Sequence, residues 1–139
     1  MRPAAFVLVA FACGGGPGEE TAAVGDVGAP VRYGEPFDLK LGERAVVAGE
    51  FRVTFERIAE ESRCPEGSRC PAEGNAAAAF AVESDAGSAT LTLNTGREPR
   101  SAAAMGGELR LLGLAPGSRP DSAADSVRYE ATLIVSPAR

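Results

Sequence analysis

Alternation of apolar and polar residues with a period of two is the feature that most constrains this chain. Apolar side chains occupy every second position in 37–41 and again in 51–55, with charged or hydroxyl-bearing side chains between them. Successive side chains of a β-strand point to opposite faces, so this period predicts strands that are buried on one face. After Phe55 the next large apolar residue is Ile58, which is out of phase and predicts a β-bulge at Glu56 and Arg57.

Further segments also have the residue pattern of strands. They are 44–48, 75–82, 89–94, 108–112 and 127–135. The segment 75–82 is ambiguous, because its four consecutive alanines favour a helix that Asn75 would cap. Phe80 and Val82 continue a strand alternation, so we expect a strand there.

The connections between these segments favour an all-β fold. Residues 84–88 have the composition of a hairpin turn, and 95–107 and 113–126 are rich in Gly, Pro, Ser and Ala, as expected of loops. About seven strands separated by such turns predict an antiparallel β-sandwich, immunoglobulin-like in architecture, or a partly closed barrel. We expect one such domain over residues 35–139.

Two of the three cysteines are close together in this domain. In an oxidising compartment Cys64 and Cys70 should pair, closing a loop of about seven residues that stabilises the fold by about 2 kcal/mol. Pro65 and Gly67 favour a tight, exposed turn within it. The residues proposed to form an interaction loop are Arg63, Pro65, Glu66 and Arg69.

The first twelve residues have the pattern of an export signal. Arg2 is followed by nine apolar residues, 4–12, about half of the roughly 20 needed to cross a bilayer as a helix. Cys13 stands where bacterial lipoproteins carry their lipidated cysteine, and lipidation would account for the odd cysteine. The alternative is ordinary cleavage after Ala12, which would release a soluble protein. We expect residues 1–12 to be removed and Cys13 to be lipidated.

Composition and charge limit the structure that residues 13–34 can form and the partners that the chain can bind. Residues 13–34 are rich in Gly, Ala and Pro and are expected to form a flexible tether. Loss of Arg2 would change the net charge from −5 to −6, which argues against nucleic acid as a partner. The expected partners are the membrane, through the lipid on Cys13, and an unidentified component of the cell envelope. Gly14 in place of an inner-membrane retention Asp favours the outer membrane by resemblance to other lipoproteins.

Residues 61–76 resemble a family of small bacterial secreted and lipid-anchored domains. The resemblance rests on Ser62-Arg63-Cys64-Pro65, on the second cysteine, Cys70, and on Gly74-Asn75-Ala76. A Trp usually follows the second cysteine in that family, whereas this chain has Ala72. The resemblance implies an all-β fold with a disulfide, and it transfers no catalytic residue.

Candidate catalytic chemistry is sparse. The chain has no histidine, its cysteines lack C-x-x-C spacing, and it has no Gly-x-Ser-x-Gly motif. Glu60 and Glu61, with Glu66 and Glu73 nearby, could in principle support acid–base chemistry or bind calcium. The favoured interpretation is a solvated charged loop, since no calcium-loop spacing is present. We therefore expect no enzyme activity, no metal and no cofactor.

Three hypotheses for function remain. The first is a non-catalytic envelope lipoprotein that acts as a binding or structural module. The second is a protease inhibitor presenting the Cys64–Cys70 loop, with Arg63 or Arg69 as bait. The third and weakest is a hydrolase that uses the acidic cluster.

Overall fold

The computed structural model describes residues 30–121 and 127–138, and these residues form eight β-strands and no helix. The strands are β1 (Phe37–Lys40), β2 (Arg44–Val47), β3 (Phe51–Glu61), β4 (Ala76–Ser84), β5 (Gly87–Asn94), β6 (Ser101–Ala104), β7 (Gly107–Ala115) and β8 (Glu130–Pro137). The all-β prediction is confirmed.

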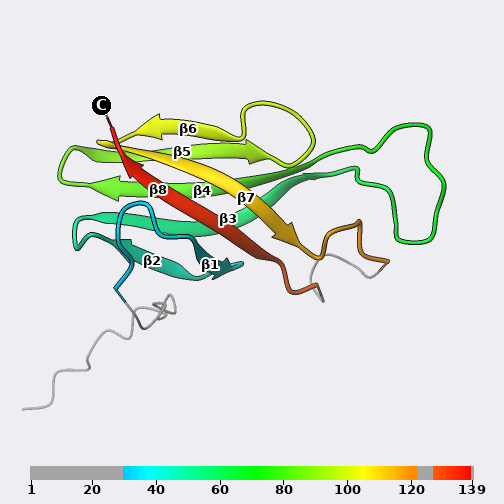
Figure 1. The fold of residues 1–139 in the computed structure, drawn as a ribbon, viewed down its shortest axis with the longest axis horizontal. Helices are drawn as coiled ribbons and strands as arrows, with labels where there is room; N and C mark the ends of the chain where they lie inside the picture. Colours follow the sequence, from blue (N-terminus) through cyan, green and yellow to red (C-terminus); the bar gives the residue numbers. More distant parts are fainter. Residues whose placement is uncertain (1–29, 122–126, 139) are drawn as a thin grey trace, which may run out of the picture.

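The strands form two four-stranded antiparallel sheets, ordered β2-β3-β4-β5 and β1-β8-β7-β6 (Figure 1). The predicted β-sandwich is therefore confirmed. The chain passes from one sheet to the other after β1 and again after β5, and within each sheet consecutive strands are neighbours. The strand order is thus up-and-down around the sandwich, so the likeness to immunoglobulin domains is limited to the two-sheet architecture.

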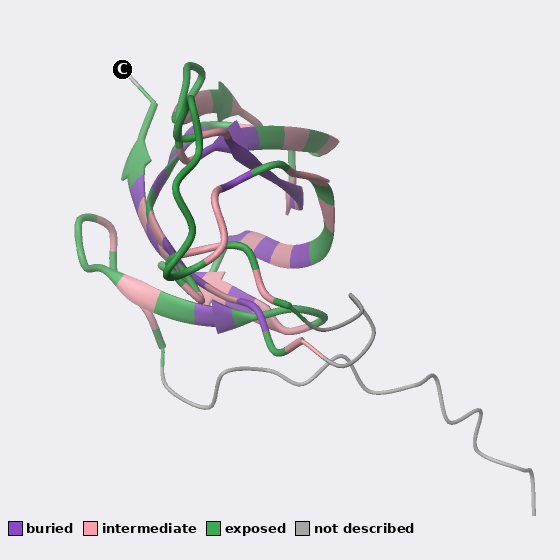
Figure 2. Ribbon diagram, turned by 90° about the vertical axis from the view of Figure 1, so that its right-hand side faces the viewer, coloured by how far each residue is buried: buried purple, intermediate pink, exposed green. Residues whose placement is uncertain are grey.

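The core lies between the two sheets, where purple buried positions alternate with exposed ones along the strands (Figure 2). Phe55 and Phe80 pack at its centre with their ring centroids 5.0 Å apart. Leu39, Leu109 and Leu133 face them from the other sheet and are fully buried. Burial of these apolar side chains drives the association of the sheets.

Two sequence expectations about β3 and β4 are confirmed. The register of β3 against β4 shifts between Phe55 and Arg57, which is the predicted bulge, and it shifts again between Ile58 and Glu60. The ambiguous alanine run forms β4. All residues from Ala76 to Phe80 are buried, so this central strand is covered on both faces, and its alternation is correspondingly weak.

Two predicted loops are wrong in part. Residues 95–107 were expected to lack strands, but they contain β6, which pairs with the start of β7 through a hairpin turn at Met105 and Gly106. Both turn residues have positive φ, 54° and 85°, as in a type I′ turn. The β6 sequence is one serine and three alanines, so it carries no polar–apolar contrast, and pairing with β7 rather than its own pattern defines it. β7 also extends to Ala115, into the second expected loop.

The chain joins the sandwich earlier than expected. Val31 bridges to Val47 of β2, and Gly34 donates a backbone hydrogen bond of 2.8 Å to Val135 of β8. Val31 and Tyr33 also pack against the core. Residues 31–34 therefore belong to the folded domain rather than to the predicted tether. The expected signal, 1–12, and the lipidation site, Cys13, lie outside the described residues.

Candidate functional site

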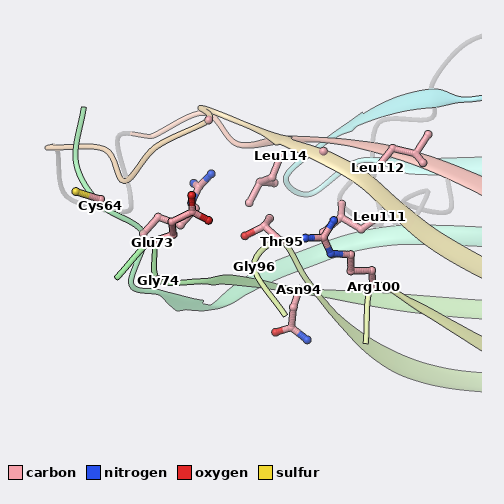
Figure 3. A pocket seen from close by; sticks show the side chains of 13 residues that line it. Cys64, Glu73, Gly74, Asn94, Thr95, Gly96, Arg100, Leu111, Leu112 and Leu114 are labelled. Carbon is pink, nitrogen blue, oxygen red and sulfur yellow. The ribbon is translucent and has the colours of Figure 1, made fainter. Parts of the chain in front are cut away.

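A cleft of about 450 Å³ opens at one end of the sandwich, where three connections meet. These are 62–75 between β3 and β4, 95–100 between β5 and β6, and the chain that follows β7. In Figure 3, Leu114 points into the cleft from β7, Thr95 and Gly96 face it from the β5–β6 connection, and Cys64, Glu73 and Gly74 bound one end. The guanidinium of Arg100 is directed into the opposite end.

The disulfide expected from the sequence is confirmed and helps to form one wall. Cys64 and Cys70 are bonded, with their Cα atoms 5.8 Å apart. The Arg119 backbone N–H donates to the Cys64 carbonyl at 3.4 Å, and Pro65 bridges to Arg119, so the disulfide loop lies against the chain after β7. Among the predicted interaction residues, Glu66 and Arg69 are exposed and Pro65 is half-buried.

Arg63 has a different environment from the one expected of a loop residue. Its side chain is only 8% exposed, and its Nε and Nη2 donate to the two carboxylate oxygens of Glu61 over 2.8 and 2.7 Å. Nη1 donates to the Pro116 carbonyl over 2.7 Å. A guanidinium has five N–H groups, and these bonds use three of them. Two donors therefore remain on a buried cation that lines the cleft.

Glu61 also accepts a hydrogen bond of 3.2 Å from the hydroxyl of Tyr129. Burial by itself raises the pKa of Glu61, but the hydrogen bonds and positive charge of Arg63, aided by Tyr129, outweigh it, and the net pKa is lowered. Burial raises the pKa of the Tyr129 phenol, and the charge of Glu61 and the hydrogen bond to it raise it further. At neutral pH the cluster thus holds an ionised Glu61, Arg63 and a neutral tyrosine.

A hydrogen-bond network around Asn75 and Asn94 joins two of the connections that form the cleft. The Asn75 side-chain amide donates to Asn94 Oδ1 at 2.9 Å and to Glu60 Oε2 at 3.2 Å, and its own Oδ1 accepts from the Gly96 backbone at 2.9 Å. Arg97 pairs with the same Glu60 oxygen at 2.6 Å. Both asparagines are buried, so this network fixes the β3–β4 and β5–β6 connections against each other.

Two glycines permit this close approach. A Cβ on Gly74 would lie 1.9 Å from the Ser62 carbonyl oxygen, and a Cβ on Gly96 would lie 2.4 Å from the Gly74 carbonyl oxygen. Gly74 also has a positive φ of 69°. In the Gly74-Asn75-Ala76 segment, then, the glycine admits a neighbouring backbone and the asparagine bonds across the cleft wall.

The remaining wall of the cleft is the second half of β7. β6 pairs with β7 only over Gly107–Arg110, and one further backbone bond runs from Leu111 N–H to the Arg100 carbonyl at 2.8 Å. From Gly113 to Ala115, β7 is paired with β8 on one side, and the register shifts at Leu112, which has no partner in β8. On its other side no strand among residues 30–121 and 127–138 pairs with it, and the cleft lies there instead.

The acidic residues expected in a solvated loop are placed differently. Glu60 and Glu61 are the last residues of β3, and each is engaged by an arginine, so the loop interpretation is wrong for this pair. Glu66 and Glu73 are exposed and lie on the β3–β4 connection. Within the described part of the chain, no group of three or more His, Cys, Asp or Glu residues is placed to hold a metal ion.

Sequence reasoning missed the residues that complete the site: Asn94, Arg100 and the Leu111–Leu114 stretch. The only sequence signal was the strand pattern of 89–94 and 108–112, which does not indicate that the two segments end at one cleft. Comparison with protein-family models, with curated proteins and with solved structures found no match. The described residues also contain no helix of the length and hydrophobicity that crossing a bilayer requires.

Proposed function

We propose that this protein is a lipid-anchored component of the bacterial cell envelope whose sandwich is a non-catalytic binding module, with the cleft as its binding site. The observation that carries the proposal is that the cleft is open while its walls are fixed. The disulfide, the Arg63–Glu61 pair and the Asn75–Asn94 bond each hold one connection in place. Binding to a preorganised site loses less conformational entropy than binding to mobile loops.

The anchor is supported by sequence features alone. The short apolar run 4–12 and the following Cys13 fit a lipoprotein signal, and a Cys64–Cys70 disulfide is compatible with a compartment outside the cytosol. Metabolic labelling with an alkyne fatty acid, followed by click detection, tests it. Label is expected on the wild-type chain and on Cys64→Ser, and it is expected to be absent from Cys13→Ser. Equal labelling of wild type and Cys13→Ser would contradict the anchor.

The ion pairs of the carboxylates Glu60 and Glu61 favour a binding role over a catalytic one. Both Glu60 and Glu61 are engaged in ion pairs. A general acid or base needs a proton-transfer partner in reach of substrate and a pKa close to the working pH. The pKa of Glu61 is instead lowered by Arg63 against the effect of burial.

Blocking the cleft tests the binding role. A Cβ on Gly113 would meet no atom within 4 Å, so Gly113→Phe should fill the cleft without disturbing its walls. The matched control is Thr90→Phe, which places the same side chain at an exposed position of β5. Crosslinking in intact cells should link wild type and Thr90→Phe to a specific envelope component and should not link Gly113→Phe to it. Equal crosslinking of the two variants would overturn the proposal.

Burial of Arg63 removes one of the two bait residues considered in the inhibitor hypothesis. Its guanidinium is bound to Glu61 and Pro116 and is not available to a protease specificity pocket. Only Arg69, which is exposed on the disulfide loop, could act as bait. Trypsin inhibition by wild type that is lost in Arg69→Ala would revive this alternative.

A further inference from the structure

The unpaired edge of β7 opens directly into the cleft. We propose that this edge accepts an extended peptide as an added strand, antiparallel to β7 and in line with β6, with the C-terminal carboxylate of the peptide bound by Arg100. This inference rests on the proposed binding function and names the ligand class and the binding mode of the same site.

The edge is exposed because β6 begins late. The Pro99 carbonyl accepts two hydrogen bonds from Asn94, one from its backbone N–H at 3.0 Å and one from its side-chain amide at 3.1 Å. The Arg100 backbone N–H donates to Glu98 Oε2 at 2.8 Å. The two Asn94 bonds hold the chain before β6 against β5, and among the described residues its backbone bonds to β7 only at Arg100. Beyond the register shift at Leu112, the regular edge is Gly113–Ala115, which is about 10 Å long at roughly 3.3 Å per residue.

The composition of this edge suits an added strand. Unpaired edges are commonly protected by charged residues, by proline, by a β-bulge or by a covering loop. Here a bulge lies at Leu112, and Gly113–Ala115 continue beyond it as regular strand. Leu112, Gly113, Leu114 and Ala115 are uncharged, and the Leu112 side chain is 50% exposed although it is large and apolar. Strand addition draws its affinity from backbone hydrogen bonds along such an edge.

The charges at the two ends of the cleft give the direction of the peptide. A strand that continues the line of β6 runs, like β6, antiparallel to β7, and it therefore ends beside Arg100. Arg100 is exposed, directs its guanidinium into the cleft and forms no ion pair with any described residue (Figure 3). Glu73 lies at the opposite end, beside Cys64. A carboxylate at the Arg100 end and the amino-terminal part of the peptide at the Glu73 end match these charges.

Arg63 also lines the cleft. Its charge is already balanced by Glu61, and two of its five N–H groups are outside the hydrogen bonds to Glu61 and Pro116. These two N–H groups are suited to donate to neutral acceptors such as peptide carbonyl groups, rather than to a second carboxylate.

The test uses a random hexapeptide library and the full-length, disulfide-bonded protein in detergent micelles. The library is made with free C-terminal carboxylates, as C-terminal amides, and as amides with Asp at the last position. Peptides enriched by the protein are resynthesised with a fluorophore at the N-terminus, and their Kd is measured by anisotropy. A fourth set carries N-methyl groups on alternate backbone amides, which removes the donors needed for strand pairing.

We expect free acids to be enriched, and amidation to weaken binding about tenfold through loss of a charge-assisted hydrogen bond. Arg100→Gln should weaken the free acids to a similar extent. The control is Arg110→Gln, at an exposed arginine in the half of β7 that pairs with β6, and it should leave the Kd unchanged. N-methylation on the β7-facing amides should abolish binding.

Two results are decisive against the inference. One is the absence of enrichment in every library, and the other is an equal effect of Arg100→Gln and Arg110→Gln. Strong, Arg100-dependent binding of the amides that end in Asp would support carboxylate recognition and assign it to a side chain rather than to the chain terminus. If no peptide binds while Gly113→Phe still loses its crosslinked envelope component, the peptide inference fails and the proposed function stands. If Gly113→Phe is still crosslinked to the envelope component, the proposed function fails.

Discussion

Tyr129 donates its hydroxyl hydrogen to Glu61 over 3.2 Å, joining residues 68 positions apart in the sequence. Glu61 ends β3 in one sheet, and Tyr129 immediately precedes β8 in the other. The same carboxylate accepts two hydrogen bonds from the guanidinium of Arg63 and one from its backbone N–H, and the guanidinium also donates to the chain after β7. One acidic side chain therefore links both sheets and one wall of the cleft.

Glu61→Gln should destabilise the domain. The substitution leaves the guanidinium of Arg63 buried without its counter-charge, and breaking a buried pair in this way costs about 3 kcal/mol. Urea denaturation followed by tyrosine fluorescence or circular dichroism measures the loss. Glu66→Gln, an exposed glutamate on the disulfide loop, should lie within about 0.5 kcal/mol of wild type. Equal stabilities would show that the Arg63 pair contributes nothing.

The stability of the domain should depend on pH through Glu61. Its pKa is lower in the folded protein than in the unfolded chain, so the ionised form stabilises the fold at pH values above the unfolded pKa of about 4.3. That contribution should decline as the pH falls from about 4.3 toward the folded pKa. Wild type should therefore lose more stability than Glu61→Gln between about pH 5 and about pH 3, the range in which a glutamate carboxyl titrates. Parallel pH profiles for the two proteins would contradict this assignment.

Gly96→Ala should be strongly destabilising although Gly96 is exposed. The added Cβ would lie 2.4 Å from the Gly74 carbonyl oxygen, and the two connections would have to separate, at a cost of about 2 kcal/mol. Gly117→Ala is the matched control, since its Cβ would meet no atom within 4 Å and its stability should stay close to that of wild type. Thermal unfolding compares the two. Equal melting temperatures would mean that the close approach of the connections is not required.

Removal of the disulfide should cost about 2 kcal/mol, the chain-entropy contribution of closing a loop of about seven residues. The double variant Cys64→Ser and Cys70→Ser should unfold at lower urea concentration than the oxidised wild type and at the same concentration as the reduced wild type. A double variant as stable as the oxidised protein would show that the hydrogen bonds of 62–75 hold this connection without the covalent link.

Strand content was accessible from the sequence wherever one face of a strand is buried. Segments 37–41 and 51–55 show the alternation because their outward positions are charged or hydroxylated, and the bulge after Phe55 appeared as a break in phase. β6 was missed because serine and alanine suit either face. Its position is fixed by pairing with β7, which is not a property of its own residues.

The two arginines that precede Cys64 and Cys70 could not be distinguished from the sequence. The sequence located Cys64 and Cys70 as a pair, but it presented Arg63 and Arg69 as equivalent flanking arginines. Their environments differ, since Arg63 is buried against Glu61 and Arg69 is exposed. Arg63 lies beyond the end of β3 and bonds both Glu61 and the Pro116 carbonyl, so its burial depends on the chain after β7, which is distant in sequence.

The sequence by itself determined that the chain folds into strands, where most of them lie, and which two cysteines pair. These are local properties, set by side-chain period, turn chemistry and a short cysteine spacing. Only the tertiary structure decided that there is a cleft and an unpaired half-strand within it. The walls of that cleft come from three connections distant in sequence, and their meeting depends on buried hydrogen bonds between residues such as Asn75 and Asn94, which no local pattern records.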